Sequence, residues 1–290
     1  MINLTTLTSG AFTATVSDMG AELQSLSRED GRQYLWHGDA AWWGGRAPIL
    51  FPIVGRAVEG RVAVNGQGGE MGQHGFARRS VFERVDQGPN FVLHRLTASE
   101  ATRAAYPSDF VLSIRHTLDG ATLTVSVTAE NTGDQDMPYC VGFHPAFCWP
   151  LPGGEGQAHR VVLDNGAEPP LSVLEGGYLA EATKPSPFAL GVLDLTHDLF
   201  ANDALIFEGG TGDGLRYGVD GGPELAFRFD NTPNLGIWQK PGAPFLCIEP
   251  WHGLAPRAGH GPEIADRPFA MTLAPGASAQ FGYSVSVLGD

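Results

Sequence analysis

The chain has 290 residues, of which 42% are hydrophobic and 17% charged, so it carries enough apolar side chains to bury a large core. Its formal net charge of −14 disfavours nucleic acid and anionic membrane surfaces as partners, because both attract clustered Lys and Arg. Composition therefore excludes a disordered chain, and no apolar run approaches the length of about 18 residues that a membrane span requires.

Short segments with apolar residues at every second position recur along the chain, which is the pattern of β-strands with one buried face. In chain order we expect strands over 11–16, 61–64, 81–85, 91–96, 110–117, 122–129, 160–163, 204–208, 225–229, 235–239, 245–249 and 280–288. We expect one short helix over Ser99–Ala105, with Ser99 as its cap and Pro107 as its stop. No linker or fixed-period repeat interrupts this pattern. The sequence thus predicts one all-β domain over residues 1–290, a large antiparallel sandwich.

The cysteines and the N-terminal segment indicate a cellular location. Three cysteines, Cys140, Cys148 and Cys247, cannot all pair within one chain, and their apolar neighbours favour buried thiols in a reducing compartment. The first residues show no basic stretch followed by an apolar one, as a secretory signal would. We therefore expect a cytoplasmic protein.

Four segments place polar residues in apolar surroundings, and the first is 42–56, WWGGRAPILFPIVGR. Its prolines disfavour a central strand and indicate an irregular edge or loop. Arg46 and Arg56 flank the apolar run. Either they extend to solvent, or one points inward and offers forked hydrogen bonds to substrate oxygens.

The next two segments each contain a single histidine. His74 precedes Gly75, where the chain can turn sharply or let a ligand approach, although a lone histidine is more often structural. His144 lies within YCVGFHPAFCW, and aromatic walls around one titratable group suit a ligand pocket as well as a satisfied core histidine.

The fourth segment, 244–253, ends an apolar strand with Glu249, a carboxylate that is costly to bury unless it is paired or functional. The alternative for Glu249 is a salt bridge to one of the arginines. Trp251 beside it offers a flat face for sugar stacking. Asp203, before another apolar strand, is a weaker case in which turn capping is the simpler role. Two imidazoles, a carboxylate and an arginine suit proton transfer rather than covalent catalysis.

Five motifs now form an ordered set along the chain: GGRAPILFPIVGR, QHGFAR, GFHPAF, FANDALIF and CIEPWHG. This set resembles the aldose 1-epimerase (galactose mutarotase-like) family, and within it the LacX-like branch, from about Phe12 to the last strand. The resemblance implies a large antiparallel β-supersandwich with a cleft on one sheet. It also implies interconversion of the α and β anomers of an aldose without a metal or organic cofactor.

Carried over by motif, the resemblance assigns roles to individual residues. Glu249 is expected to remove the proton from the C1 hydroxyl and His144 to protonate the ring oxygen. His74 and Arg46 are expected to hold substrate oxygens, and Asp203 to accept hydrogen bonds from sugar hydroxyls. Because the acid must be protonated while the base is ionised, a bell-shaped pH–rate profile is expected.

Three alternatives stay open. A hexose-6-phosphate 1-epimerase of the same fold would use arginines such as Arg46, Arg56 and Arg78 for the phosphate. A non-catalytic carbohydrate-binding protein would keep a stacking platform made of Trp251, Trp238 and Phe147. A metal site of His74, His144, Glu249 and His252 lacks the tight His spacing typical of such sites. The expected partner is a small aldose, with no nucleic acid or membrane, and the oligomeric state is not predicted.

Overall fold

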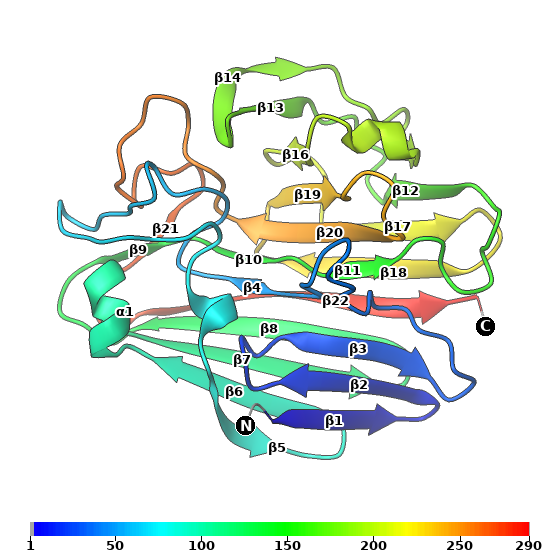
Figure 1. The fold of residues 1–290 in the computed structure, drawn as a ribbon, viewed down its shortest axis with the longest axis horizontal. Helices are drawn as coiled ribbons and strands as arrows, with labels where there is room; N and C mark the ends of the chain where they lie inside the picture. Colours follow the sequence, from blue (N-terminus) through cyan, green and yellow to red (C-terminus); the bar gives the residue numbers. More distant parts are fainter. Residues whose placement is uncertain (1–2, 290) are drawn as a thin grey trace.

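The computed structural model describes residues 3–289, and antiparallel β-sheets dominate it (Figure 1). A nine-stranded sheet and an eight-stranded sheet are accompanied by a three-stranded and a two-stranded sheet. The predicted all-β antiparallel supersandwich is therefore confirmed.

The nine-stranded sheet runs across the whole molecule. Its strand order is β15 (Val192–Asp194), β12 (His159–Leu163), β17 (Gly214–Val219), β18 (Glu224–Asp230), β22 (Ser278–Leu288), β8 (Thr122–Asn131), β7 (Phe110–Asp119), β6 (Phe91–Thr97) and β5 (Glu83–Gln87). In β7 buried residues alternate with partly exposed ones along nearly the whole strand, as expected for one core-facing side.

The eight-stranded sheet carries the segments that the sequence marked as unusual. Its order is β14 (Tyr178–Lys184), β13 (Leu171–Glu175), β16 (Leu205–Phe207), β19 (Asn234–Trp238), β20 (Phe245–His252), β10 (Val141–Phe143) and β4 (Ile49–Leu50), and β11 (Ala146–Cys148) also pairs with β20. The smaller sheets are formed by β1 (Leu4–Ser9), β2 (Phe12–Ser17) and β3 (Leu23–Arg28), and by β9 (Met137–Tyr139) with β21 (Met271–Leu273).

The largest hydrophobic cluster joins these layers. The eight-stranded sheet packs on the nine-stranded sheet, for example where Phe147 meets Phe227 with ring centroids 5.1 Å apart. In Figure 1 the three-stranded sheet lies in front of the part of the nine-stranded sheet that contains β6, β7 and β8, and it contacts β6 and β7. Leu7 of β1 and Val287 of β22 belong to the same buried cluster, so both ends of the described chain share one core.

Helical structure is limited to α1 (Glu100–Ala105) and two 3-10 turns, Ala77–Arg79 and His197–Phe200, among the described residues. The predicted cap is confirmed, because the Ser99 hydroxyl accepts a hydrogen bond from the Thr102 amide at 3.2 Å. No helix in the described part of the chain is long and apolar enough to cross a membrane.

The predicted strand over 61–64 is wrong. Arg61 makes only isolated bridges, with Val58 and Glu70, because the chain reverses immediately afterwards. Asn65 and Gly66 both have positive φ and form that turn, which leaves too short a segment for a ladder. The predicted strand over 81–85 is shifted in the structure to β5, Glu83–Gln87.

Strand β20 is central to the eight-stranded sheet, and its two faces differ in chemistry. Leu246 and Ile248 point into the core between the two large sheets. Cys247, Glu249 and Trp251 alternate with them and therefore lie on the outer face of the sheet. That outer face holds the candidate site.

Candidate active site

His144 and Glu249 are direct neighbours across two strands. In the pairing with β20, Gly142 lies opposite Trp251 and Ala146 lies opposite Cys247, so the same register places His144 opposite Glu249. His144 Nε2 is 3.2 Å from Glu249 Oε2, and both side chains are buried. The structure thus brings the predicted acid and base into contact.

The backbone between β10 and β11 keeps this contact in place. The His144 amide donates to the Pro48 carbonyl at 3.1 Å, and the Pro145 carbonyl accepts from the Ile248 amide at 3.1 Å. Pro145 has no amide to donate, so regular pairing is interrupted here while both neighbours remain anchored.

His74 reaches the same site from a strained turn. Its φ is +65°, which is uncommon for a residue with a Cβ. A Cβ on Gly75 would lie 2.1 Å from the Phe51 carbonyl oxygen, so the turn requires glycine there. The imidazole rings of His74 and His144 are perpendicular, with centroids 5.5 Å apart.

A hydrogen bond fixes the tautomer of His74. The Gly55 amide donates to His74 Nδ1 at 3.1 Å, so in the neutral ring Nε2 carries the proton, and the side-chain amide of Gln73 lies 3.2 Å from Nε2. Arg267 holds the turn that contains Gly55, because its guanidinium donates to the carbonyls of Val54 (2.5 Å) and Arg56 (2.9 Å). Arg267 is only 4% exposed. Because it holds the turn that contains Gly55, its guanidinium indirectly supports the position of His74.

Burial shifts the pKa values of these groups toward their uncharged forms. Burial raises the pKa of Glu249 well above its usual value, and the charge of Asp203 raises it further. Burial, followed by the charges of His74 and Arg78, lowers the pKa of His144. Burial also lowers the pKa of His74 to about 3. Near neutral pH His74 is therefore neutral, and His144 and Glu249 share one proton across their contact.

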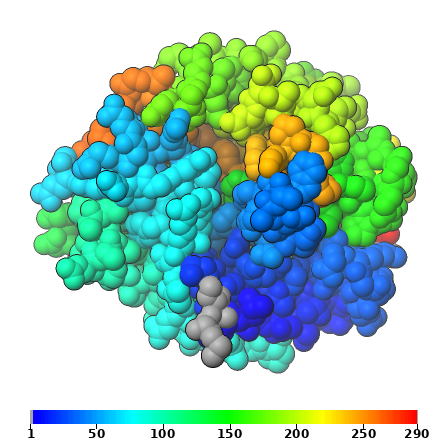
Figure 2. Space-filling model, in the orientation of Figure 1, coloured from blue at the N-terminus to red at the C-terminus, as the bar shows by residue number. Residues whose placement is uncertain are grey.

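Tryptophans form one wall beside the pair. The Trp43 ring stacks on His144 with centroids 4.9 Å apart, and Trp238 meets His144 edge-on at 5.8 Å. Trp36 Nε1 donates to the Trp43 carbonyl at 2.9 Å, which holds this loop against the sheet. Both Trp43 and Trp238 remain partly exposed, so their rings border open space. Figure 2 shows a hollow on this side of the molecule, between the cyan segment and the blue and orange segments.

Asp203 and Arg46 lie around the pair in different ways. Asp203 is exposed, with φ +86°, and accepts a hydrogen bond from the Ala204 amide at 2.8 Å, as in the turn-capping interpretation. It is also close enough to influence the Glu249 pKa, which places it at the edge of the site. The Arg46 carbonyl accepts from the Ala146 amide at 2.8 Å, but its guanidinium donates to the Gln24 side chain. A role for Arg46 in substrate binding stays a prediction.

Arg78, named from the sequence only as one possible phosphate ligand, lies near both histidines. Its charge lowers the pKa values of both His74 and His144, and its side chain is only partly exposed. The motif QHGFAR already contains both residues, because Arg78 follows His74 closely in the sequence.

Two predicted sugar contacts need correction. Phe147 is fully buried in the core between the sheets, against Phe227, so it faces away from Glu249 and its predicted contact with substrate is wrong. Trp251 does lie on the outer face but is 5% exposed. Its ring covers Gly142 and Gly236, where an added Cβ would lie 2.5 and 2.4 Å from the indole. Trp251 forms a packed floor rather than an open stacking surface.

The structure does not assemble the metal site of four residues that the sequence left open. His252 has the opposite side-chain direction from Glu249 on β20, and its Nδ1 lies 2.8 Å from the Asn231 carbonyl oxygen. Its ring packs on Phe281 with centroids 5.4 Å apart. His252 is therefore engaged elsewhere.

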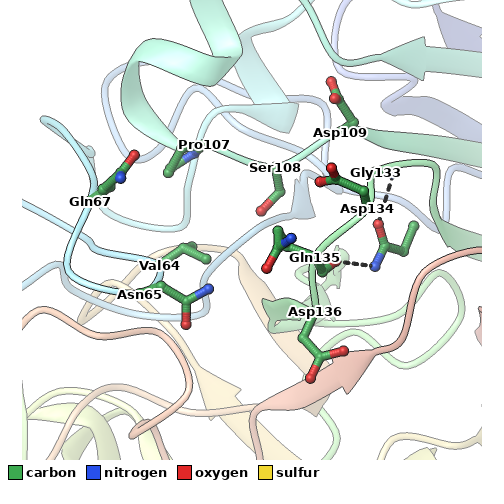
Figure 3. Close-up of a pocket in the computed structure, with 11 residues that line it drawn as sticks. Val64, Asn65, Gln67, Pro107, Ser108, Asp109, Gly133, Asp134, Gln135 and Asp136 are labelled. Atoms are coloured by element: carbon green, nitrogen blue, oxygen red, sulfur yellow. Dashed lines mark hydrogen bonds between the residues drawn. The ribbon is translucent and has the colours of Figure 1, made fainter.

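A pocket near α1 differs in character from the candidate site (Figure 3). It has a volume of about 310 Å³ and is lined by the segments around Asn65, Ser108 and Asp134. Asn131, which is buried at its base, already donates to the carbonyls of Gln135 and Leu273. The predicted acid/base residues lie outside this pocket.

Comparisons with known proteins agree with this geometry. The family model for aldose 1-epimerase matches residues 3–259. Protein LacX (chromosomal) of Lactococcus lactis subsp. lactis is 29% identical over 283 residues, covering 93% of this chain and 94% of that protein.

Solved structures show the same architecture over the whole chain. A galactose mutarotase related enzyme from Lactobacillus acidophilus superposes with a TM-score of 0.92 at 28% identity, covering 100% of this chain and 98% of that one. A galactose mutarotase-like protein from Lactobacillus casei superposes with a TM-score of 0.90 at 26% identity, covering 99% and 100%. The resemblance stated from the motifs is confirmed, and the chain belongs to the aldose 1-epimerase family.

Proposed function

We propose that this protein is an aldose 1-epimerase, a mutarotase that interconverts the α and β anomers of a free aldose by acid/base ring opening. The observation that carries the proposal is the contact of His144 Nε2 with Glu249 Oε2 at 3.2 Å, buried on the outer face of the eight-stranded sheet. Ring opening needs one group that accepts a proton and one that donates, both near the same carbon. This pair supplies the two groups at the required spacing.

The proton inventory of the pair fits the reaction. In the reacting form the shared proton lies on His144, so Glu249 takes the proton from the C1 hydroxyl while His144 gives its proton to the ring oxygen, and the C1–ring oxygen bond breaks. Rotation about C1–C2 presents the other face of the aldehyde. Closure then returns one proton from Glu249 to the C1 oxygen and one from the ring-closing hydroxyl to His144. The pair holds one proton at the start and at the end of each cycle.

The surroundings support a neutral, hydroxyl-rich substrate. Trp43 and Trp238 offer partly exposed apolar faces beside the pair, suited to the C–H surfaces of a sugar. His74, neutral and with Nε2 carrying the proton, is able to donate a hydrogen bond to a sugar oxygen. Asp203 at the edge is able to accept one.

A hexose 6-phosphate is the second candidate substrate, and Arg78 near both histidines is the observation that favours it. The other arginines around the sheet are engaged. Arg46 binds Gln24, Arg257 binds Glu208 at 2.7 Å, and Arg267 binds backbone carbonyls. A free aldose therefore fits better than a dianionic phosphate, which commonly requires several converging arginines.

The test is a mutarotation assay by polarimetry or NMR on freshly dissolved α-anomers of several aldoses and of their 6-phosphates. We expect faster anomer equilibration with at least one free aldose. Acceleration confined to the phosphates would support the second candidate, and none with any sugar would contradict the proposal.

A further inference from the structure

Cys247 has no role in the proposed reaction, yet it lies beside the acid/base pair. It precedes Glu249 by two residues on β20, points to the same face and is buried. One potential ligand atom from each of His144, Cys247 and Glu249 lies within 4.8 Å of the other two. An imidazole, a thiol and a carboxylate therefore converge on one point.

The spacing of His144 and Glu249 matches that of two ligands around a tetrahedral metal ion. Two nitrogen or oxygen ligands of zinc lie about 3.3 Å apart, and a sulfur ligand lies about 3.6 Å from its neighbours, given usual bond lengths. The 3.2 Å between His144 Nε2 and Glu249 Oε2 is therefore compatible with a shared ion as well as with a shared proton. The Cys247 sulfur, which lies within 4.8 Å of both atoms, would have to move closer to reach the same ion.

The charges also match. A thiolate and a carboxylate together neutralise a divalent cation, which relieves the cost of burying Glu249 as an anion. The mixed sulfur and nitrogen set selects zinc-like ions over magnesium or calcium. His144 Nδ1, however, is buried without a hydrogen-bond partner in the described part of the chain. Ligand histidines of resident metal sites usually have such a partner, so the set suits an exchangeable ion rather than a permanent one.

We propose that His144, Cys247 and Glu249 bind a thiophilic divalent cation such as Zn²⁺, and that the bound ion inhibits the enzyme. The inhibition rests on the proposed mutarotase function, because the ion occupies the lone pairs that would otherwise exchange protons with the sugar. Metal binding itself does not depend on that function. Free zinc thus becomes a reversible inhibitor of this site.

The first experiment measures binding on the full chain with Co²⁺, whose thiolate complexes absorb in the near ultraviolet. Wild type and Cys148→Ser are expected to bind one Co²⁺ with this band, and Zn²⁺ should displace it. Cys148 is the matched control, a partly buried thiol on β11. Cys247→Ser should lose the band. Absence of the band in wild type, or its persistence in Cys247→Ser, would overturn the site.

The second experiment measures mutarotation with increasing Zn²⁺ and then with EDTA. Zn²⁺ should inhibit wild type and Cys148→Ser, and EDTA should restore both. Cys247→Ser should keep the basal rate and need at least about tenfold more Zn²⁺ for the same inhibition. Unchanged sensitivity of Cys247→Ser would refute the inhibitory role. If no sugar is turned over, the proposed function fails while the cobalt band still tests the metal site.

Discussion

Two histidine–carboxylate contacts of nearly equal length occur in different parts of this molecule. His144 and Glu249 meet at 3.2 Å on the eight-stranded sheet, and His94 on β6 meets Asp18 at 3.1 Å beside the three-stranded sheet. All four side chains are buried. Distance and burial alone therefore do not separate a site from a structural contact.

The partners of the carboxylates make the difference. Asp18 also faces Arg84 at 3.8 Å and accepts a hydrogen bond from Asn3 at 3.1 Å, so its charge is compensated within the fold. Glu249 instead faces His144 and the Cys247 thiol, and the nearby charge of Asp203 opposes its ionisation. His144 is also bordered by partly exposed tryptophans, whereas His94 neighbours the buried His116. A carboxylate whose charge is poorly compensated, next to open space, is what marks the site.

The largest expected effect concerns Glu249. Glu249→Gln should lower kcat about 10²–10⁴-fold, because the variant cannot accept the C1 proton. Asp18→Asn is the comparison variant, and it should keep kcat while losing about 1–3 kcal/mol of the free energy of unfolding. Mutarotation rates and urea unfolding measure the two properties. Full activity in Glu249→Gln, or inactivity of a folded Asp18→Asn, would contradict the assignment of the first contact to the active site and of the second to structure.

The pH dependence of kcat/KM should show a wide plateau around neutral pH. The active pair of His144 and Glu249 holds one proton. Binding of a second proton gives buried His144 a positive charge, and loss of the single proton gives buried Glu249 a negative charge. Burial opposes both changes, since it lowers the pKa of His144 and raises that of Glu249. The acid limb should therefore fall below pH 6.5, the ordinary histidine value, and the alkaline limb well above 4.5, the ordinary glutamate value. An acid limb at or above pH 6.5 would contradict this account.

His116 should contribute to pH-dependent stability rather than to activity. Burial lowers its pKa from 6.5 to about 3, so between these values the unfolded chain binds a proton that the folded protein does not. The free energy of unfolding should then rise with pH by up to about 1.4 kcal/mol per unit over that window. In His116→Leu this part of the slope should disappear. Urea unfolding at several pH values tests it, and an unchanged slope would show that His116 titrates normally.

Arg267 should affect substrate binding more than turnover. Arg267→Lys keeps the charge but loses the guanidinium, whose Nη2 donates to the carbonyls of both Val54 and Arg56, so His74 loses its fixed position. We expect KM to rise several-fold while kcat stays within about twofold. Arg103→Lys, at an exposed ion pair with Asp109, is the control and should change neither constant. A fall in kcat alone would argue against a positioning role through His74.

The smallest expected effect tests which face of the sheet each aromatic occupies. Phe147→Leu should cost about 1–2 kcal/mol of the free energy of unfolding, because it thins the core against Phe227, and KM should not change. Trp238→Leu should raise KM instead, because its ring borders the pair. A KM change in Phe147→Leu would restore the contact that the structure excludes.

Much of the fold could be predicted from local pattern, because alternation in segments such as 122–129 reports one buried face directly. The segment over 61–64 failed because its alternation is too short to overcome the turn at Asn65 and Gly66. His74, His144 and Glu249 could be named from the sequence because polar groups in apolar segments carry a cost. Their assembly on one face of the sheet is visible only in the structure. The single-domain organisation and the cytoplasmic location stay predictions.

Other features of the site depend on register and side-chain direction, which the sequence does not contain. Phe147 lies only three residues from His144, and near Pro145 no local rule says which face each takes. The cross-strand pairing of His144 with Glu249 is likewise set by β10 and β11 together. The sequence gives no reason to prefer Arg46 or Arg78 as a neighbour of the site. Only the fold shows that Arg46 binds Gln24 while Arg78 lies near the histidines.

The two-sided character of β20 has a consequence for laboratory evolution. Leu246 and Ile248 belong to the core shared by both sheets, whereas Cys247 lies on the outer face and has no role in the proposed reaction. Mutational tolerance along this strand should therefore alternate residue by residue. A library that varies position 247 together with the loop around Trp43 would search new sugar preferences while leaving the core that supports Glu249 unchanged.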